Sequence, residues 1–358
     1  MKNKITFREA INRLEENNLQ HYVLDLHNNL KAILVERGGR LLGPFENDES
    51  ESIFWINSSF AGKESFKSFL DSTESWNLGG ERMWIAPEIQ YRSSDRKDFW
   101  NTLFLAKEMD PGNYILEKVN ENNYKLKAEM SIMAYNLASG QKNLNVERYF
   151  SAIPDPLRSL NNYYELTKDV KFAGYEQSIN ISERKTDDIL SEAWVLIQLN
   201  AGGNIFIPVT CSDVEFTDYF QPVDENYQKI NNNYIDLKIS GDRQYKVGYN
   251  SAYLSGRLGY MNKIDGQKSY LIIRNFFNNP SSVYAEEPPE VYGKRGNSVH
   301  VYNDNGMFGG FGELECNGLT LGGETKRKSS RDAMVLWIYT GKEEKLIEII
   351  RRLLGITL

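Results

Sequence analysis

Two glutamates lie two positions apart near the end of the chain. Glu313 and Glu315 flank Leu314 in the segment from Phe311 to Cys316, whose residues predict a strand. On an extended strand both carboxylates point to one face and Leu314 points to the other. If that face lines a pocket, burial and mutual repulsion raise the pKa of one carboxyl group of such a pair and leave the other ionised, which supplies an acid and a base. On a solvated face the same pair has no chemical role.

A cation and an indole have the same spacing in an earlier segment. Arg82 and Trp84 follow a Gly-Gly pair, and on a strand their side chains share one face. Sugar hydroxyls pair with guanidinium and carboxylate groups, and the flat C–H face of a sugar lies well against an aromatic ring. The alternative is an arginine that packs its stem over a core tryptophan.

Several other chemistries lack the residues they need. The sequence has no GxxxxGK[ST], no GxGxxG after a strand, no HExxH, no CxxC and no GxSxG. The sequence has three histidines, His21, His27 and His300, which are few for a multi-histidine metal site or a Ser-His-Asp triad. We therefore expect no metal and no cofactor. Cys211 and Cys316 are expected to be free thiols.

Charge and hydropathy exclude two classes of partner. The chain has 42 basic and 49 acidic residues, a net charge of -7, and no long basic run, which argues against binding of nucleic acid. No stretch has the length of a membrane span, and residues 1–20 lack the apolar core of a signal peptide. We therefore expect a cytoplasmic protein without a membrane or nucleic-acid partner.

The remaining pattern predicts an all-β protein with a short helix at each end. Apolar residues at helical spacing predict helices over 1–20, capped by Thr6, and over 341–355, capped by Thr340 and ended by Gly355. Between them lie many short strands divided by turn residues, which favours a large antiparallel β-sandwich formed as a single domain over 1–358.

Two segments do not fit the strand pattern. Residues 61–77 are rich in Ser, Glu and Phe, and residues 278–296 carry clustered charge and proline. Proline and clustered charge exclude a central strand. Both segments are therefore expected to be long loops, which are often functional.

Three segments, in this order along the chain, resemble the galactose mutarotase-like superfamily and its uncharacterised bacterial branch. They are Glu36-Arg37-Gly38-Gly39-Arg40-Leu41-Leu42-Gly43, Gly79-Gly80-Glu81-Arg82-Met83-Trp84-Ile85-Ala86-Pro87-Glu88, and Gly309-Gly310-Phe311-Gly312-Glu313-Leu314-Glu315-Cys316. The resemblance implies a supersandwich fold and a carbohydrate ligand.

The resemblance also implies roles for individual residues. Substrate-binding positions are Arg40, Arg82, Trp84 and Glu88. Mutarotases use a carboxylate base on the anomeric hydroxyl and a histidine acid on the ring oxygen, which implies Glu313 as base, with Glu315 second. The family's H-x-Y-F-N segment has no counterpart here, so His300 is the histidine that remains to act as the acid.

The leading hypothesis is a carbohydrate-binding protein, acting either as an aldose or sugar-phosphate epimerase or as a non-catalytic sugar sensor. A glycosidase or lyase that uses two carboxylates is a second enzyme class. A structural or partner-binding module whose aromatic residues are core is a third reading. The expected partner is a small carbohydrate, and a homodimer is left open.

Overall fold

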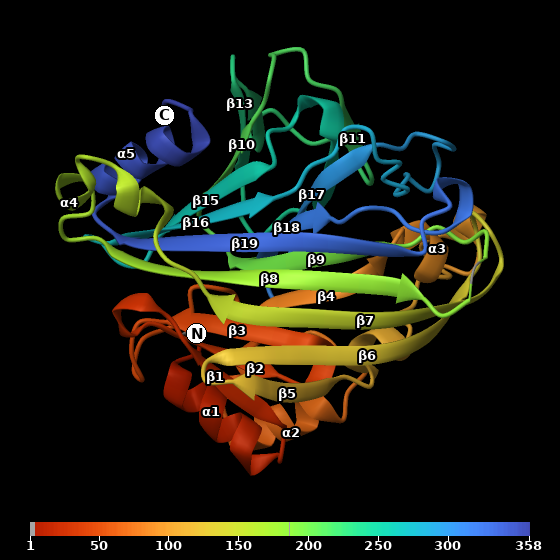
Figure 1. Cartoon of the computed structure of the whole chain (residues 1–358), viewed down its shortest axis with the longest axis horizontal. Coiled ribbons are helices and arrows are strands. Elements are labelled where there is room, and N and C mark those ends of the chain that lie inside the picture. The colour runs from red at the N-terminus through yellow and green to blue at the C-terminus, as the bar shows by residue number, and fades with distance from the viewer. Residues whose placement is uncertain (1–3, 186) are drawn as a thin grey trace.

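The computed structural model of the protein describes residues 4–185 and 187–358, and its strands form two sheets packed face to face (Figure 1). In spatial order, the nine-stranded sheet consists of β1 (His21–Asp25), β2 (Lys31–Val35), β3 (Arg40–Phe45), β4 (Glu81–Ala86), β9 (Glu192–Asn200), β18 (Phe311–Asn317), β17 (Asn297–Asn303), β14 (Tyr245–Asn250) and β11 (Phe216–Asp218). The ten-stranded sheet consists of β12 (Gln228–Ile230), β13 (Tyr234–Lys238), β10 (Asn204–Pro208), β15 (Arg257–Lys263), β16 (Ser269–Phe276), β19 (Ser329–Gly341), β8 (Lys171–Glu183), β7 (Gly140–Ala152), β6 (Asn123–Ala134) and β5 (Ile115–Asn120). Neighbouring strands in both sheets run antiparallel, so the predicted all-β antiparallel sandwich is confirmed.

The helices are short and lie at the margins of the sandwich. They are α1 (Phe7–Glu16), α2 (Lys63–Leu70), α3 (Glu88–Tyr91), α4 (Tyr163–Leu166) and α5 (Glu343–Leu354). Shorter turns of helix are η1 (His27–Asn29), η2 (Arg37–Gly39), η3 (Ser58–Ala61), η4 (Arg96–Asp98), η5 (Glu108–Gly112), η6 (Pro156–Ser159), η7 (Ser251–Tyr253) and η8 (Gly323–Thr325). Figure 1 shows α1 and α2 together at one end of the molecule and α4 and α5 together on another side.

The N-terminal helix begins with the capping box that the sequence predicts. The Thr6 hydroxyl accepts a hydrogen bond from the Glu9 backbone N–H at 3.2 Å, and the Thr6 N–H donates to Glu9 Oε2 at 2.8 Å. The helix is shorter than the predicted range 1–20, of which residues 1–3 lie outside the described residues.

We expect Thr6→Ala to lower the free energy of unfolding by about 1 kcal/mol, because a helix N–H loses its acceptor. Urea titration measures this change. Thr73→Ala, in an exposed loop, is the control and should change the free energy by less than about 0.5 kcal/mol. Equal effects of the two changes would contradict the capping role.

The C-terminal helix ends as predicted but begins differently. Gly355 has φ 71 and ends α5, as expected for residues 341–355. The prediction that Thr340 caps the helix was wrong, because β19 continues past Thr340, which pairs with Tyr270 of β16. Lys342 occupies the cap position without a side-chain hydrogen bond.

The loop predicted over residues 61–77 contains a helix, so that prediction was wrong in part. Helix α2 buries Phe66 completely and packs the half-buried Phe69 and Leu70 against the cluster that includes Ala10 of α1. The spacing of these three apolar residues suits a helix face. Lys67 and Ser68, which lie between them, are exposed.

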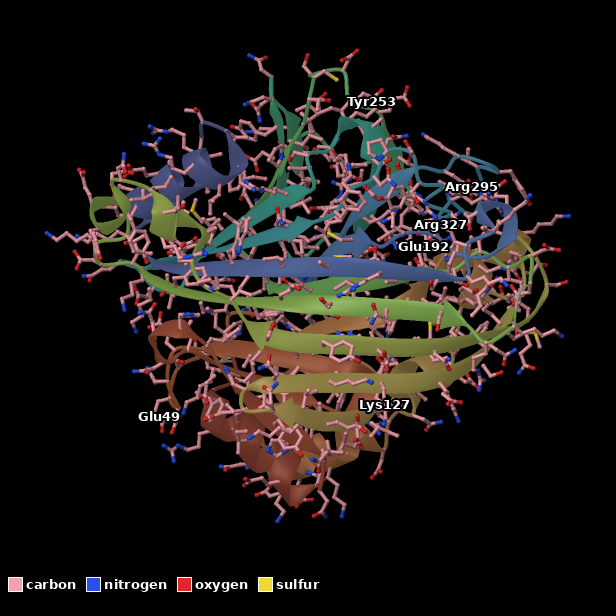
Figure 2. The ribbon with its side chains drawn as sticks, viewed as in Figure 1. Glu49, Lys127, Glu192, Tyr253, Arg295 and Arg327 are labelled. Atoms are coloured by element: carbon pink, nitrogen blue, oxygen red, sulfur yellow. The ribbon has the colours of Figure 1, made fainter. Side chains whose placement is uncertain are left out.

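The loop predicted over residues 278–296 is irregular, as expected. Glu192, at the start of β9 and labelled in Figure 2, holds this loop. One of its carboxylate oxygens accepts the Ala285 N–H and the Thr320 hydroxyl, the latter at 2.7 Å. The other oxygen accepts the Asn317 amide at 2.8 Å. A buried carboxylate therefore fixes this loop beside the nine-stranded sheet.

A polar cluster lies inside the apolar core between the two sheets. Glu81 of β4 forms an ion pair with Arg274 of β16 and accepts the Tyr175 hydroxyl of β8 at 2.7 Å. Glu81, Arg274 and Tyr175 are at most 1% exposed. Because both partners belong to the ten-stranded sheet, the cluster joins the two sheets.

Candidate functional site

Five adjacent strands of the nine-stranded sheet, β4, β9, β18, β17 and β14, position the site. Side chains alternate between the faces of a strand, and Glu81 points toward the ten-stranded sheet. Arg82 and Trp84 alternate with Glu81 and Met83, so Arg82 points away from that sheet. On β18, Glu313 and Glu315 also point away from the ten-stranded sheet, while Leu314 belongs to the core between the sheets.

The strand register brings these side chains into rows. Trp84 lies opposite Trp194 of β9, and Glu313 lies between Gln198 of β9 and Tyr302 of β17. Segments more than 200 positions apart in sequence therefore meet on one face.

A cavity of about 300 Å³ opens on this face. Its lining residues are Trp76, Arg82, Trp84, Glu88, Arg92, Phe99, Trp100, Leu103, Trp194, Phe220, Gln244, Lys246, Tyr302, Met307, Phe308, Phe311, Glu313 and Glu315. Aromatic rings thus share one cavity with three cations and three carboxylates, the combination typical of a polar small-molecule site.

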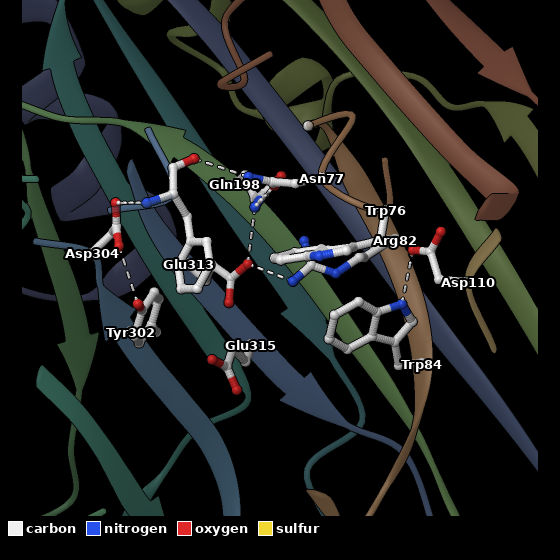
Figure 3. A network of polar contacts seen from close by, with 12 residues as sticks. Trp76, Asn77, Arg82, Trp84, Asp110, Gln198, Tyr302, Asp304, Glu313 and Glu315 are labelled. Atoms are coloured by element: carbon white, nitrogen blue, oxygen red, sulfur yellow. Dashed lines mark hydrogen bonds and ion pairs between the residues drawn. The ribbon is translucent and has the colours of Figure 1, made fainter. Parts of the chain in front are cut away.

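Glu313 is held through one of its oxygens. Oε1 accepts hydrogen bonds from Arg82 Nη2 at 2.6 Å and Gln198 Nε2 at 3.2 Å (Figure 3). Gln198 is fixed in turn by Asn77, whose side-chain oxygen accepts its amide at 3.0 Å. Oε2 of Glu313 has no hydrogen-bond partner among the described residues, which leaves it for a ligand.

Glu315 is more deeply buried and is also held through one oxygen. Oε2 accepts the Trp194 Nε1–H at 2.8 Å and lies 3.4 Å from Lys246 Nζ. Burial raises the pKa of Glu315 to about 7, an effect that Lys246 opposes and Glu313 strengthens. Both protonation states of Glu315 are therefore populated at neutral pH, as a proton-transferring group requires.

Lys246 pairs with Glu315 and with Glu88, and so joins these two carboxylates of the cavity. Lys246 Nζ and Arg92 Nη1 each lie 2.8 Å from a different oxygen of Glu88. Burial disfavours the charged amine, but Glu315, Glu88 and Glu286 outweigh it and raise the pKa of Lys246. Lys246 is therefore a fixed cation rather than a proton donor.

Glu286, in the loop over residues 278–296, lies behind this group. It accepts the backbone N–H of Glu88, and burial raises its pKa to about 8. The charged face of the cavity is thus supported from this loop.

Trp84 lines the cavity, but two of the three cations there, Arg82 and Arg92, lie against its ring. The guanidinium carbons of Arg82 and Arg92 lie 4.1 and 4.8 Å from the ring centroid. Trp84 is 1% exposed, and its Nε1–H donates to Asp110 at 3.1 Å. Trp84 therefore supports Arg82. Among the other rings that line the cavity, Trp76 is half-buried and Trp100 is exposed.

Arg40 lies outside the cavity, away from the position that the resemblance implied. Its side chain is fully buried and pairs with Asp110 at 2.6 Å, on the same oxygen that accepts the Trp84 N–H. Burial lowers the pKa of Arg40 to about 10. Arg40 also donates hydrogen bonds to the backbone carbonyls of Trp76 and Gly79. It therefore supports the cavity from outside, through the backbone at Trp76 and through the Asp110 carboxylate that holds Trp84.

His300 does not line the cavity either. It lies opposite Glu315 in the register, but its Nε2 pairs with the Tyr219 hydroxyl at 3.0 Å, and the residue is 1% exposed. Burial, with Lys246 nearby, lowers the pKa of His300 well below its ordinary value. The ring also packs against Gly248, where an added side-chain carbon would lie 2.8 Å from Cδ2.

Of the predicted site residues, the structure therefore brings Arg82, Trp84, Glu88, Glu313 and Glu315 to one cavity, whose lining does not include Arg40 or His300. Sequence reasoning missed Lys246, although the sequence contains a signal for it. A lysine between Tyr245 and Val247 on a buried strand points to the opposite face from its apolar neighbours. Trp76 and Trp100 lie in irregular segments without a periodic pattern.

Within residues 4–185 and 187–358, no group of three or more His, Cys, Asp or Glu side chains has the arrangement of a metal site. None of the described helices is long and apolar enough to cross a membrane.

The fold and site define a class: an antiparallel β-sandwich protein with a charged, aromatic cavity on the outer face of one sheet. The chain belongs to a family of unknown function, DUF6786, whose model matches residues 5–358. No curated protein matches it significantly.

Among solved structures, the chain is similar to the Slr1438 protein from Synechocystis sp. PCC 6803, with 11% sequence identity over 90% of this chain and 96% of that one and a TM-score of 0.46. It is also similar to a GalM/aldose epimerase homologue from C. elegans, with 8% identity over 91% of this chain and 100% of that one and a TM-score of 0.43.

Proposed function

We propose that this protein binds a carbohydrate in the cavity and accelerates the exchange of its anomers, as an aldose 1-epimerase-like isomerase. The observation that carries the proposal is that Glu313 and Glu315 share a cavity of about 300 Å³ with aromatic side chains. A sugar needs both kinds of group, because it presents hydroxyls as well as flat C–H faces.

The sequence resemblance gives independent support. Two of the segments that resemble the galactose mutarotase-like superfamily, Gly79 to Glu88 and Gly309 to Cys316, both contribute to this one cavity. The third segment supplies Arg40, which supports Trp84 through Asp110.

In the proposed reaction, Oε2 of Glu313 removes the proton of the anomeric hydroxyl while Glu315 donates a proton to the ring oxygen. The bond between the anomeric carbon and the ring oxygen breaks and an aldehyde forms. Rotation about the adjacent carbon–carbon bond and reversal of both proton transfers close the ring with the other configuration. Glu315 takes the place of the histidine acid of mutarotases, since His300 lies outside the cavity.

The rate of exchange should depend on pH through Glu315. Its pKa of about 7 means that the protonated acid is lost as pH rises above 7. We expect kcat/KM to fall about tenfold per pH unit well above that value. Exchange NMR from pH 5 to 9 measures this profile. A rate that stays constant between pH 6 and 9 would contradict the assignment of Glu315 as the acid.

A second candidate function, a non-catalytic sugar sensor, is favoured by one observation. Arg82, Arg92 and Lys246 are each already paired with a carboxylate of the protein, as in a site that is organised for binding alone. A sensor would bind sugars and leave the exchange rate at its value in buffer.

A panel of aldoses screened by thermal shift tests the binding that both functions require. A ligand that binds only the native state raises the unfolding temperature, and saturation at 100 times Kd adds about 2.7 kcal/mol. Sorbitol, an open-chain polyol, controls for general co-solvent stabilisation. If no ring sugar stabilises the protein more than sorbitol does, the carbohydrate proposal falls.

A further inference from the structure

Aromatic rings form a continuous series from the buried end of the cavity to its mouth. The ring centroids of Phe311 and Tyr302 are 6.2 Å apart, those of Tyr302 and Phe220 are 6.1 Å apart, and those of Phe220 and Trp100 are 4.8 Å apart. Exposure rises along the series, from 1% at Phe311 to 54% at Trp100.

The outer end of the series is unusually apolar for a surface. Trp100 and Met307 line the cavity, and they are 54% and 73% exposed. Trp100 is braced from behind by the buried Phe99, with a centroid distance of 5.1 Å. A large ring held in place yet open to solvent, and continuous with a cavity, marks a contact surface for a ligand.

The polar groups beside the series match a sugar better than a purely apolar group. Gln244 also lines the cavity, and its amide donates to the Tyr302 hydroxyl at 3.3 Å. A flat ring next to an amide suits the C–H face and the hydroxyls of a pyranose.

We propose that a second sugar ring stacks on Trp100, so that the ligand is the reducing end of a disaccharide or longer oligosaccharide. This inference rests on the proposed function for the inner ring. Because Glu313 and Glu315 lie at the buried part of the cavity, the ring with the free anomeric carbon lies there. The remaining sugar units of the oligosaccharide extend past Trp100 toward solvent.

Isothermal titration calorimetry tests the inference with glucose, galactose, maltose, cellobiose and lactose, and with 4-O-benzyl-glucose, which keeps a free anomeric carbon, as an apolar alternative. We expect the best disaccharide to bind the unaltered protein about tenfold more tightly than its component monosaccharides. In Trp100→Ala this advantage should disappear, with monosaccharide affinity changed by less than about twofold. Tyr164→Ala, which removes an 87% exposed ring that does not line the cavity, should leave every affinity unchanged.

The other possible results would contradict either the second sugar ring or the proposed function itself. Equal affinities for monosaccharides and disaccharides, or equal weakening of both by Trp100→Ala, would refute the second ring and leave the proposed function standing. Tighter binding of 4-O-benzyl-glucose than of every disaccharide would assign the outer surface to an apolar group. If no sugar binds the unaltered protein, the proposed function itself fails.

Discussion

Replacement of Glu313 by glutamine should slow anomer exchange by about 10²- to 10⁴-fold, because the amide cannot remove the proton of the anomeric hydroxyl. The amide oxygen can still accept the hydrogen bonds that Arg82 and Gln198 now donate to Glu313. Sugar affinity should therefore fall far less than the rate. Exchange NMR gives the rate and calorimetry gives the affinity on the same preparation.

Glu176→Gln is the matched control, since Glu176 lies half-buried on β8 of the other sheet and lines no part of the cavity. It should leave the exchange rate unchanged. If Glu313→Gln retains full activity in a protein that accelerates exchange, Glu313 is not the base.

Glu81→Ala should lower the free energy of unfolding by about 3–5 kcal/mol. The substitution leaves Arg274 buried between the sheets without its carboxylate and removes the acceptor of the Tyr175 hydroxyl. A buried charge without a partner cannot recover its hydration, so the cost far exceeds that of a surface pair. Guanidinium titration followed by circular dichroism measures the loss.

The surface ion pair between Glu117 and Lys127, the latter labelled in Figure 2, offers the control. Both side chains are about 40% exposed, so Glu117→Ala should cost less than about 1 kcal/mol. A similar small cost for Glu81→Ala would show that the buried cluster does not hold the sheets together. Because Glu81 points away from the cavity, sugar affinity should be independent of this change.

The strands and the facing of their side chains were predictable because both follow local rules. The two-residue spacing of Glu313 and Glu315, and of Arg82 and Trp84, determines that each pair shares a face once the strand is extended. The turn between β1 and β2 at Asn28 and Asn29 follows a local rule as well. Both asparagines adopt positive φ between β1 and β2, which their short polar side chains tolerate.

The contacts of each site residue were not predictable, because they come from distant parts of the chain. Arg92 as well as Arg82 lies against the ring of Trp84, and Asp110 of η5 accepts the hydrogen bond from its N–H. No local sequence pattern predicts these partners. Whether the side chain of a strand histidine lines a cavity also depends on residues from other segments that pack against it. For His300 these are Tyr219 and Gly248, from two other segments.

The most direct test of the central claim is a crystal structure of the protein soaked with the best-binding sugar of the panel. The proposed function predicts a pyranose ring in the cavity on the outer face of the nine-stranded sheet. Its anomeric hydroxyl should lie within about 3.2 Å of Glu313 Oε2, and its ring oxygen within the same reach of Glu315. A sugar bound at saturating concentration anywhere else, or in this cavity with its anomeric carbon turned away from both carboxylates, would contradict it.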